Sequence, residues 1–234
     1  MTAKAIFKTK TNISPKWILS YFPINYKEMI YIEPYVRSLG VLFTKEHSEL
    51  EVVNDEDKGI TKLLKSLRNE PKELISKLKR IKCTDRTFQM ASRQTEFETP
   101  LDHAINEFVL RKMSRGGNKK HFNGSETWIE SVKDLCELAP RVQNLVILNK
   151  KAALTIKAFD DSNSLCYVPM PDTEGDTDFS IDEVIEISET LNNFLGKVII
   201  TGYLSPLYKR LFKTWKTNKQ LNKSGKTECV WSNF

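Results

Sequence analysis

Short apolar segments with strand character alternate with amphipathic helical segments along nearly the whole chain. In the segment 58–68, for example, Ile60, Leu63, Leu64 and Leu67 recur on one face of a helix. The predicted strands are 29–34, 52–54, 145–148, 165–168 and 198–201. Strands that alternate with helices usually form a mainly parallel sheet covered by helices on both faces. We therefore expect an α/β fold.

Local helix and turn signals agree with this interpretation. Pro71 suits the first turn of a second helix, and Ser180 with Glu183 three residues later matches a capping box. The segment 222–225 is a turn that closes a final hairpin. Further helices are expected at 101–113, 126–138, 152–159, 180–194 and 206–215.

The chain carries a basic excess that is unevenly placed. Its 234 residues can bury one sizeable core, or one core with a small extra lobe, and 36 basic against 30 acidic residues give a formal charge of +6. The basic residues gather in two clusters. Clusters of this kind can neutralise phosphates, but they can equally form a solvated helix face. The two clusters are Lys62, Lys65, Arg68, Lys72, Lys77, Lys79, Arg80 and Lys82, and Lys209, Arg210, Lys213, Lys216, Lys219, Lys223 and Lys226.

Other features exclude whole classes of function. No stretch of about 18 apolar residues occurs, and the N-terminal segment lacks the apolar core of a signal peptide. We expect an intracellular, cytoplasmic protein with no membrane partner. The four cysteines and three histidines show no metal-ligand spacing, so no metal is expected.

Several segments, in the correct order, resemble the Dam-like adenine-N6 DNA methyltransferases. Segments 31–35 and 36–43 are similar to the family's first strand and cofactor loop, and 51–55 to its second strand. Segments 104–117, 138–147, 201–203 and 226–234 are similar to the approach to target recognition, the stretch before the catalytic strand, a late strand and the last strand. The resemblance implies a Rossmann-like methyltransferase sheet with helices on both faces, formed by 1–55 and 141–234, and a helical DNA-recognition lobe inserted at 56–140.

The residues that should perform the chemistry are missing. The family's Asp-Pro-Pro-Tyr turn supplies an acid and a proline carbonyl for the target amine and an aromatic ring for the base. Pro169, Met170, Pro171 and Asp172 stand at these positions, after Tyr167 and Val168. Proline offers no side-chain acceptor, so no catalytic residue is intact.

The implied S-adenosylmethionine site is also eroded. Glycines let a loop approach a ligand closely, but Arg37, Ser38 and Leu39 replace those expected here, and a Gly-Gly-Lys turn expected near 8–13 is absent. Asp55 stands where the family's ribose acid would lie, although it also suits a turn or a helix cap. Glu33 is expected to persist for a structural hydrogen bond. These five residues form a vestigial cofactor site, and no cofactor is expected.

The loop that the resemblance assigns to DNA recognition retains more of the residue types expected there. The run from Ser114 to Phe122 combines two glycines with cations and an aromatic ring, which suits contact with phosphates and base edges, although an ordinary basic turn is the alternative. The predicted DNA-binding residues are Arg115, Asn118, Lys119, Lys120 and His121.

Together these patterns favour a catalytically degenerate methyltransferase homologue. We expect it to bind double-stranded DNA, or to regulate an active methyltransferase partner as a subunit, and to be nucleoid-associated when DNA-bound. One alternative is an active S-adenosylmethionine-dependent DNA adenine-N6 methyltransferase with divergent motifs. A second is a structural protein-interaction module on the same fold.

Overall fold

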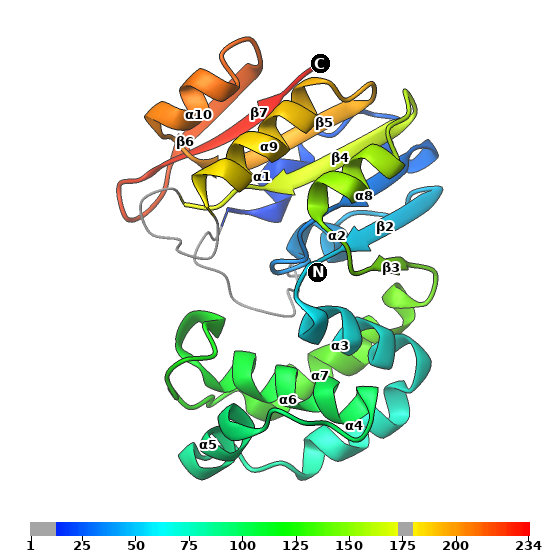
Figure 1. The fold of residues 1–234 in the computed structure, drawn as a ribbon, viewed down its shortest axis with the longest axis vertical. Helices are drawn as coiled ribbons and strands as arrows, with labels where there is room; N and C mark the ends of the chain where they lie inside the picture. The colour runs from blue at the N-terminus through cyan, green and yellow to red at the C-terminus, as the bar shows by residue number, and fades with distance from the viewer. Residues whose placement is uncertain (1–12, 173–179) are drawn as a thin grey trace.

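The computed structural model describes residues 13–172 and 180–234, and a seven-stranded sheet forms the centre of this part of the chain (Figure 1). The strand order is β3-β2-β1-β4-β5-β7-β6. Strands β1 to β5 run parallel, whereas β7 runs antiparallel to both β5 and β6. The strands are β1 (Ile30–Glu33), β2 (Leu50–Asn54), β3 (Val146–Leu148), β4 (Ser164–Pro169), β5 (Lys197–Tyr203), β6 (Lys216–Leu221) and β7 (Thr227–Ser232).

The strand order is consistent with a Rossmann-like α/β fold, as predicted. One face of the sheet packs against α8 (Ala152–Ala158), α9 (Ile181–Asn192) and α10 (Pro206–Leu211). The opposite face packs against α1 (Pro15–Leu19) and α2 (Gly40–Thr44), with the 3-10 turn η1 (Tyr26–Glu28) leading into β1.

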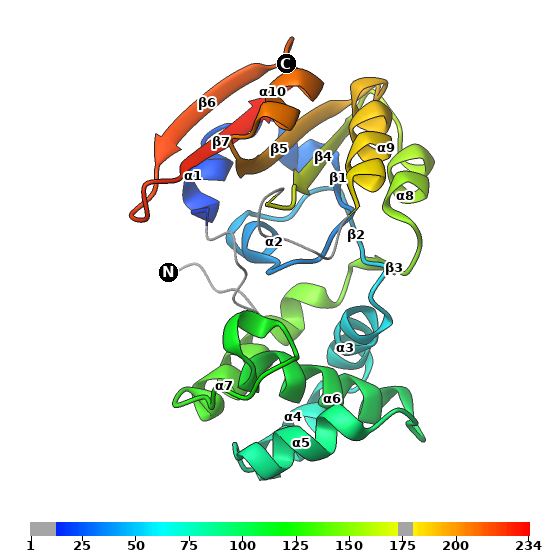
Figure 2. The same ribbon diagram turned by 60° about the vertical axis from the view of Figure 1, so that its left-hand side comes forward.

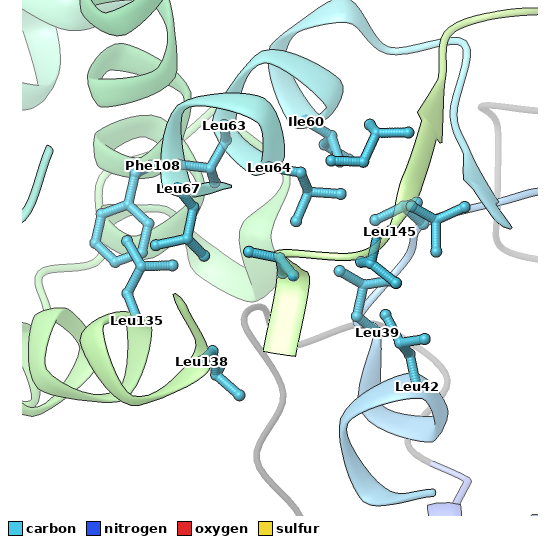
Figure 3. Packing of buried hydrophobic residues seen from close by; sticks show 14 of the residues in the cluster. Leu39, Leu42, Ile60, Leu63, Leu64, Leu67, Phe108, Leu135, Leu138 and Leu145 are labelled. Carbon is cyan, nitrogen blue, oxygen red and sulfur yellow. The ribbon is translucent and has the colours of Figure 1, made fainter. Parts of the chain in front are cut away.

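The helices between β2 and β3 form a separate group beside the sheet, shown below it in Figure 1 and turned in Figure 2. Helix α3 is the link, because its buried stripe packs against both the sheet loops and the other helices (Figure 3). The group comprises α3 (Lys58–Asn69), α4 (Pro71–Arg80), α5 (Asp85–Arg93), α6 (Pro100–Met113), η2 (Arg115–Gly117), α7 (Trp128–Leu138) and η3 (Ala139–Val142).

The local signals explain most of these boundaries. Asp57 caps α3 by accepting from the Gly59 amide at 2.8 Å, and Pro71 occupies the first turn of α4. The capping box predicted for α9 is present, since Ser180 and Glu183 exchange hydrogen bonds of 3.1 and 2.7 Å.

The prediction of a helix over 206–215 was too long. Helix α10 ends at Leu211, and Trp215 instead precedes the edge strand β6. The Trp215 indole donates to Asn192 Oδ1 at 2.8 Å, so contact with the end of α9 decides its place. The predicted turn at 222–225 is confirmed, with Gly225 at φ 78° between β6 and β7.

Candidate functional site: a small cavity at the strand ends and an exposed basic loop

The residues predicted to form a vestigial cofactor site lie at the C-terminal edge of the parallel strands. Glu33 ends β1, and the loop that follows it carries Arg37, Ser38 and Leu39 into α2. Leu39 has φ 56° and ψ 17°, the left-handed conformation that glycine adopts most easily. Its side chain is buried beside Leu42 and Leu145 (Figure 3). The loop thus keeps a glycine-like backbone turn while it fills the space with a leucine.

Little room is left between the predicted cofactor residues and the predicted catalytic turn. A cavity of ≈ 30 Å³ lies between Glu33, Arg37, Tyr167, Pro169 and Thr201 in the described part of the chain. One water needs about 10–15 Å³, whereas sites for drug-sized ligands occupy about 300–1,000 Å³. The cavity therefore has space for about two waters.

Glu33 is a buried, neutral acid at pH 7. Only 2% of its surface is exposed, and burial raises its pKa to about 8 although Tyr31 donates a hydrogen bond to it. The Tyr31 hydroxyl lies 3.0 Å from Glu33 Oε2, which is the structural hydrogen bond that the sequence suggested. Glu33 therefore does not offer a charged carboxylate to a ligand.

Asp55 braces the backbone. Its Oδ2 accepts from the Val36 amide at 2.9 Å and its Oδ1 from the Asp57 amide at 2.8 Å. Burial raises the Asp55 pKa to about 6, and the two backbone hydrogen bonds act against that rise. These contacts support the turn role that the sequence offered as an alternative for Asp55.

Asn54, which the sequence did not single out, has a similar part. Its side chain is fully buried and donates to the carbonyls of Pro34 and Lys150 at 3.1 and 2.9 Å, while its Oδ1 accepts from the Lys150 amide. One side chain thus joins the ends of β1, β2 and β3. The sequence offered one signal for this role, a side-chain amide at the end of an apolar strand.

The turn predicted to be a degenerate catalytic motif, residues 169–172, is held by contacts with neighbouring elements. The Met170 amide donates to the Thr201 carbonyl at 2.7 Å, and its side chain is buried. The Tyr208 hydroxyl donates to the Pro171 carbonyl at 2.7 Å. Asp172 forms an ion pair with Lys226 at 2.8 Å. The only acid of the motif therefore faces a cation of the β6–β7 turn.

The predicted DNA-binding residues divide into two groups. Arg115, Asn118, Lys120 and His121 lie toward solvent on the loop after α6, whereas Lys119 is turned inward. The loop is closed by a bridge between Ser114 and Phe122 and by a hydrogen bond from the Arg115 amide to the His121 carbonyl at 3.1 Å. The outward-facing groups are thus presented by a fixed backbone.

Lys119 belongs to a four-residue ion-pair cluster formed with Asp57, Glu107 and Arg111. Its ammonium lies 2.8 Å from Asp57 and 3.2 Å from Glu107, and Arg111 pairs with both acids. Burial opposes ionisation of Asp57, but the hydrogen bond from Lys119 and the charges of Lys119 and Arg111 hold its pKa below the usual value. Lys119 therefore anchors the loop to the start of α3. Sequence spacing had no signal for this, because the acids lie 62 and 12 residues away.

A second buried cluster joins the sheet to the helical group. Arg141 contacts both carboxylate oxygens of Glu51, and Lys45 lies 2.5 Å from Glu51 Oε1. Burial lowers the Lys45 pKa to about 8. Burial also opposes ionisation of Glu51, but the hydrogen bonds from Arg141 and Lys45 lower its pKa overall. This cluster fixes η3 against β2 and does not line the cavity.

Two further kinds of feature would bear on function, groups of metal-binding side chains and membrane-spanning helices. Among residues 13–172 and 180–234, no group of three or more histidine, cysteine or acidic side chains is placed to hold a metal ion. No helix in the described ranges is both long and apolar enough to cross a membrane. The segment 8–13, where the resemblance places a Gly-Gly-Lys turn that this sequence lacks, lies almost wholly outside the described residues.

Comparisons with known proteins leave the family open. No protein-family model matches the chain, and no curated protein matches it. The crystal structure of precorrin-8W decarboxylase, the product of gene MT0146 of Methanobacterium thermoautotrophicum, is similar over 97% of this chain and 94% of that one. The sequence identity is 8% and the TM-score is 0.40, which identifies neither family nor activity.

Proposed function

We propose that the chain is a catalytically degenerate relative of the adenine-N6 DNA methyltransferases that binds double-stranded DNA as a non-catalytic subunit. This proposal is supported by the contrast between a small cavity and an exposed loop. At the predicted catalytic position, the described residues leave a cavity of ≈ 30 Å³. Four of the five recognition-loop residues nevertheless face solvent on a braced backbone.

The lost chemistry follows from the contacts of the degenerate turn. Pro169 has no side-chain acceptor for an adenine amine, and the Pro171 carbonyl already accepts from Tyr208. Asp172 is paired with Lys226. The parallel order β3-β2-β1-β4-β5, with β7 antiparallel beside it, agrees with the sheet that the resemblance implies. The scaffold is retained, but the groups that would bind and orient an amine are not.

DNA would lie along the edge where the recognition loop and the β6–β7 turn both project. In Figure 1 the two segments lie on the left-hand side, and β4 points its C-terminal end toward that side. Lys223 in the turn is exposed, as are Arg115 and Lys120 in the loop. Cations from two elements would then contact phosphates, which gives sequence-independent affinity that salt weakens.

The test is a salt titration of duplex binding with matched variants. Arg115→Ala/Lys120→Ala should weaken binding and reduce the slope of log affinity against log salt by about 0.9 for each phosphate that is no longer neutralised. Arg93→Ala/Lys133→Ala removes the same charge from α5 and α7, outside both basic clusters, and should leave binding close to wild type. Undetectable binding at low salt, or equal losses in both variants, would refute the proposal.

Two further assays separate this proposal from its alternatives. Calorimetric titration with S-adenosylmethionine should show no appreciable binding, and micromolar affinity would favour the active-enzyme alternative. Co-expression with an active homologue should give co-purification or a changed methylation rate. A chain that neither associates with such an enzyme nor alters its DNA affinity or rate is not its subunit.

A further inference from the structure

The sheet face covered by α8, α9 and α10 has strongly separated charges. The three helices lie side by side at the front of Figure 1. Helix α9 carries four acids and no base, whereas α10 and the residue two places beyond it carry only bases. The acids are Asp182, Glu183, Glu186 and Glu189, and the bases are Lys209, Arg210 and Lys213.

The acidic half is also hollowed and partly apolar. A groove of ≈ 340 Å³ between α8 and α9 is lined by three acids, one base and two apolar residues, among others: Asp160, Glu186, Glu189, Lys157, Ile156 and Phe194. Two exposed leucines lie on or next to the same elements, since Leu154 on α8 is 56% exposed and Leu195, next to Phe194, is 73% exposed. Acids repel phosphates, and clustered exposed apolar side chains are typical of protein interfaces. This half therefore suits a basic protein surface and not DNA.

The basic half is fixed next to the acidic half. Asn192 at the end of α9 donates to the Leu211 carbonyl of α10 at 3.3 Å and accepts from the Trp215 indole at 2.8 Å. Burial raises the pKa of the Cys229 thiol, while Lys219 and Lys209 both act to lower it. Lys219 of β6 pairs with Cys229, which packs in the core beneath these helices, so Lys219 extends the basic half on this face.

We propose that this face is a self-association surface, on which a second copy of the chain docks through a two-fold axis between α9 and α10. Such an axis would place the acids of α9 in one copy against the bases of α10 in the other, twice. A two-fold interface must be self-complementary, and this face carries both signs side by side. The recognition loop after α6 is not part of it, so the pairing does not depend on DNA binding.

Analytical ultracentrifugation of the full chain tests this proposal. Wild-type protein should sediment as a dimer that salt weakens. Glu186→Lys/Glu189→Lys, and separately Lys209→Glu/Arg210→Glu, should each raise the dissociation constant by roughly tenfold or more. The matched control Glu49→Lys/Glu98→Lys makes the same charge change at two acids elsewhere and should dimerise as wild type does. Circular dichroism checks that each variant is folded.

Mixing the two interface variants is the decisive experiment. Each carries like charges on both helices, yet an acid-reversed copy complements a base-reversed copy at both contacts of the two-fold. The mixture should therefore form heterodimers although neither variant pairs alone. The proposal is wrong if the wild type is a monomer at low salt, if both variants dimerise normally, or if the mixture stays monomeric. The proposal is also wrong if Lys209→Glu/Arg210→Glu weakens DNA binding but leaves the sedimenting mass unchanged. That result would assign the α10 surface to nucleic acid.

Discussion

Replacing Glu33 by glutamine should make the stability of the protein less dependent on pH. Glutamine has nearly the shape of the neutral acid, and its carbonyl can accept the hydrogen bond that Tyr31 donates at 3.0 Å. It cannot lose a proton, however. Because burial raises the Glu33 pKa from 4.5 to about 8, the wild type must bury a charge at high pH that the variant never carries.

The sign and size follow from proton linkage. Between pH 4.5 and about 8, folded Glu33 keeps a proton that the unfolded chain has lost. The free energy of unfolding therefore falls as pH rises, and the stabilisation is complete below 4.5 and lost above about 8. At roughly 1.4 kcal/mol per pH unit, the full difference is on the order of 5 kcal/mol, and structural relaxation should reduce it to about 2–4 kcal/mol.

Urea denaturation from pH 5 to pH 9 measures this difference. Glu33→Gln should match the wild type near pH 5 and exceed it increasingly toward pH 9. Lys45 is present in both proteins, so its own titration largely cancels. Glu49→Gln, at an exposed acid, should run parallel to the wild type. A constant offset between Glu33→Gln and wild type over the whole range would refute the reasoning, because it would show that Glu33 titrates normally.

Three further substitutions test the backbone turn and the ion-pair clusters. Leu39→Ala should cost about 1 kcal/mol more than Leu39→Gly in thermal or urea unfolding, because both lose the buried side chain but only glycine relieves φ 56°; the reverse order would show that the turn is unstrained. Gly59→Ala would place a Cβ 2.2 Å from Glu107 Oε2 and should destabilise the fold by about 2 kcal/mol, with Lys58→Ala as the neutral control. Arg141→Ala should cost about 3 kcal/mol, because Glu51 would keep only Lys45 as a buried cation together with the Ser48 amide; a loss below about 1 kcal/mol would show that these two partners suffice.

Much of the fold is readable from local pattern. The stripe Ile60, Leu63, Leu64 and Leu67 defines α3, and all four side chains are buried. The α9 capping box and the last hairpin turn were also predictable, because each depends on a few neighbouring residues. Helix α5 was missed, since its buried residues Phe88 and Ala91 form too short a stripe to stand out.

The candidate site was decided by long-range contacts. The sequence alone shows Pro169 where the resemblance expects an acid, and Arg37, Ser38 and Leu39 where it expects glycines. Only tertiary structure turns Lys119 inward to Asp57 and keeps Glu33 protonated. The reason is physical: helix and turn signals act over a few residues, whereas burial and ion pairing depend on groups that are adjacent only after the chain has folded.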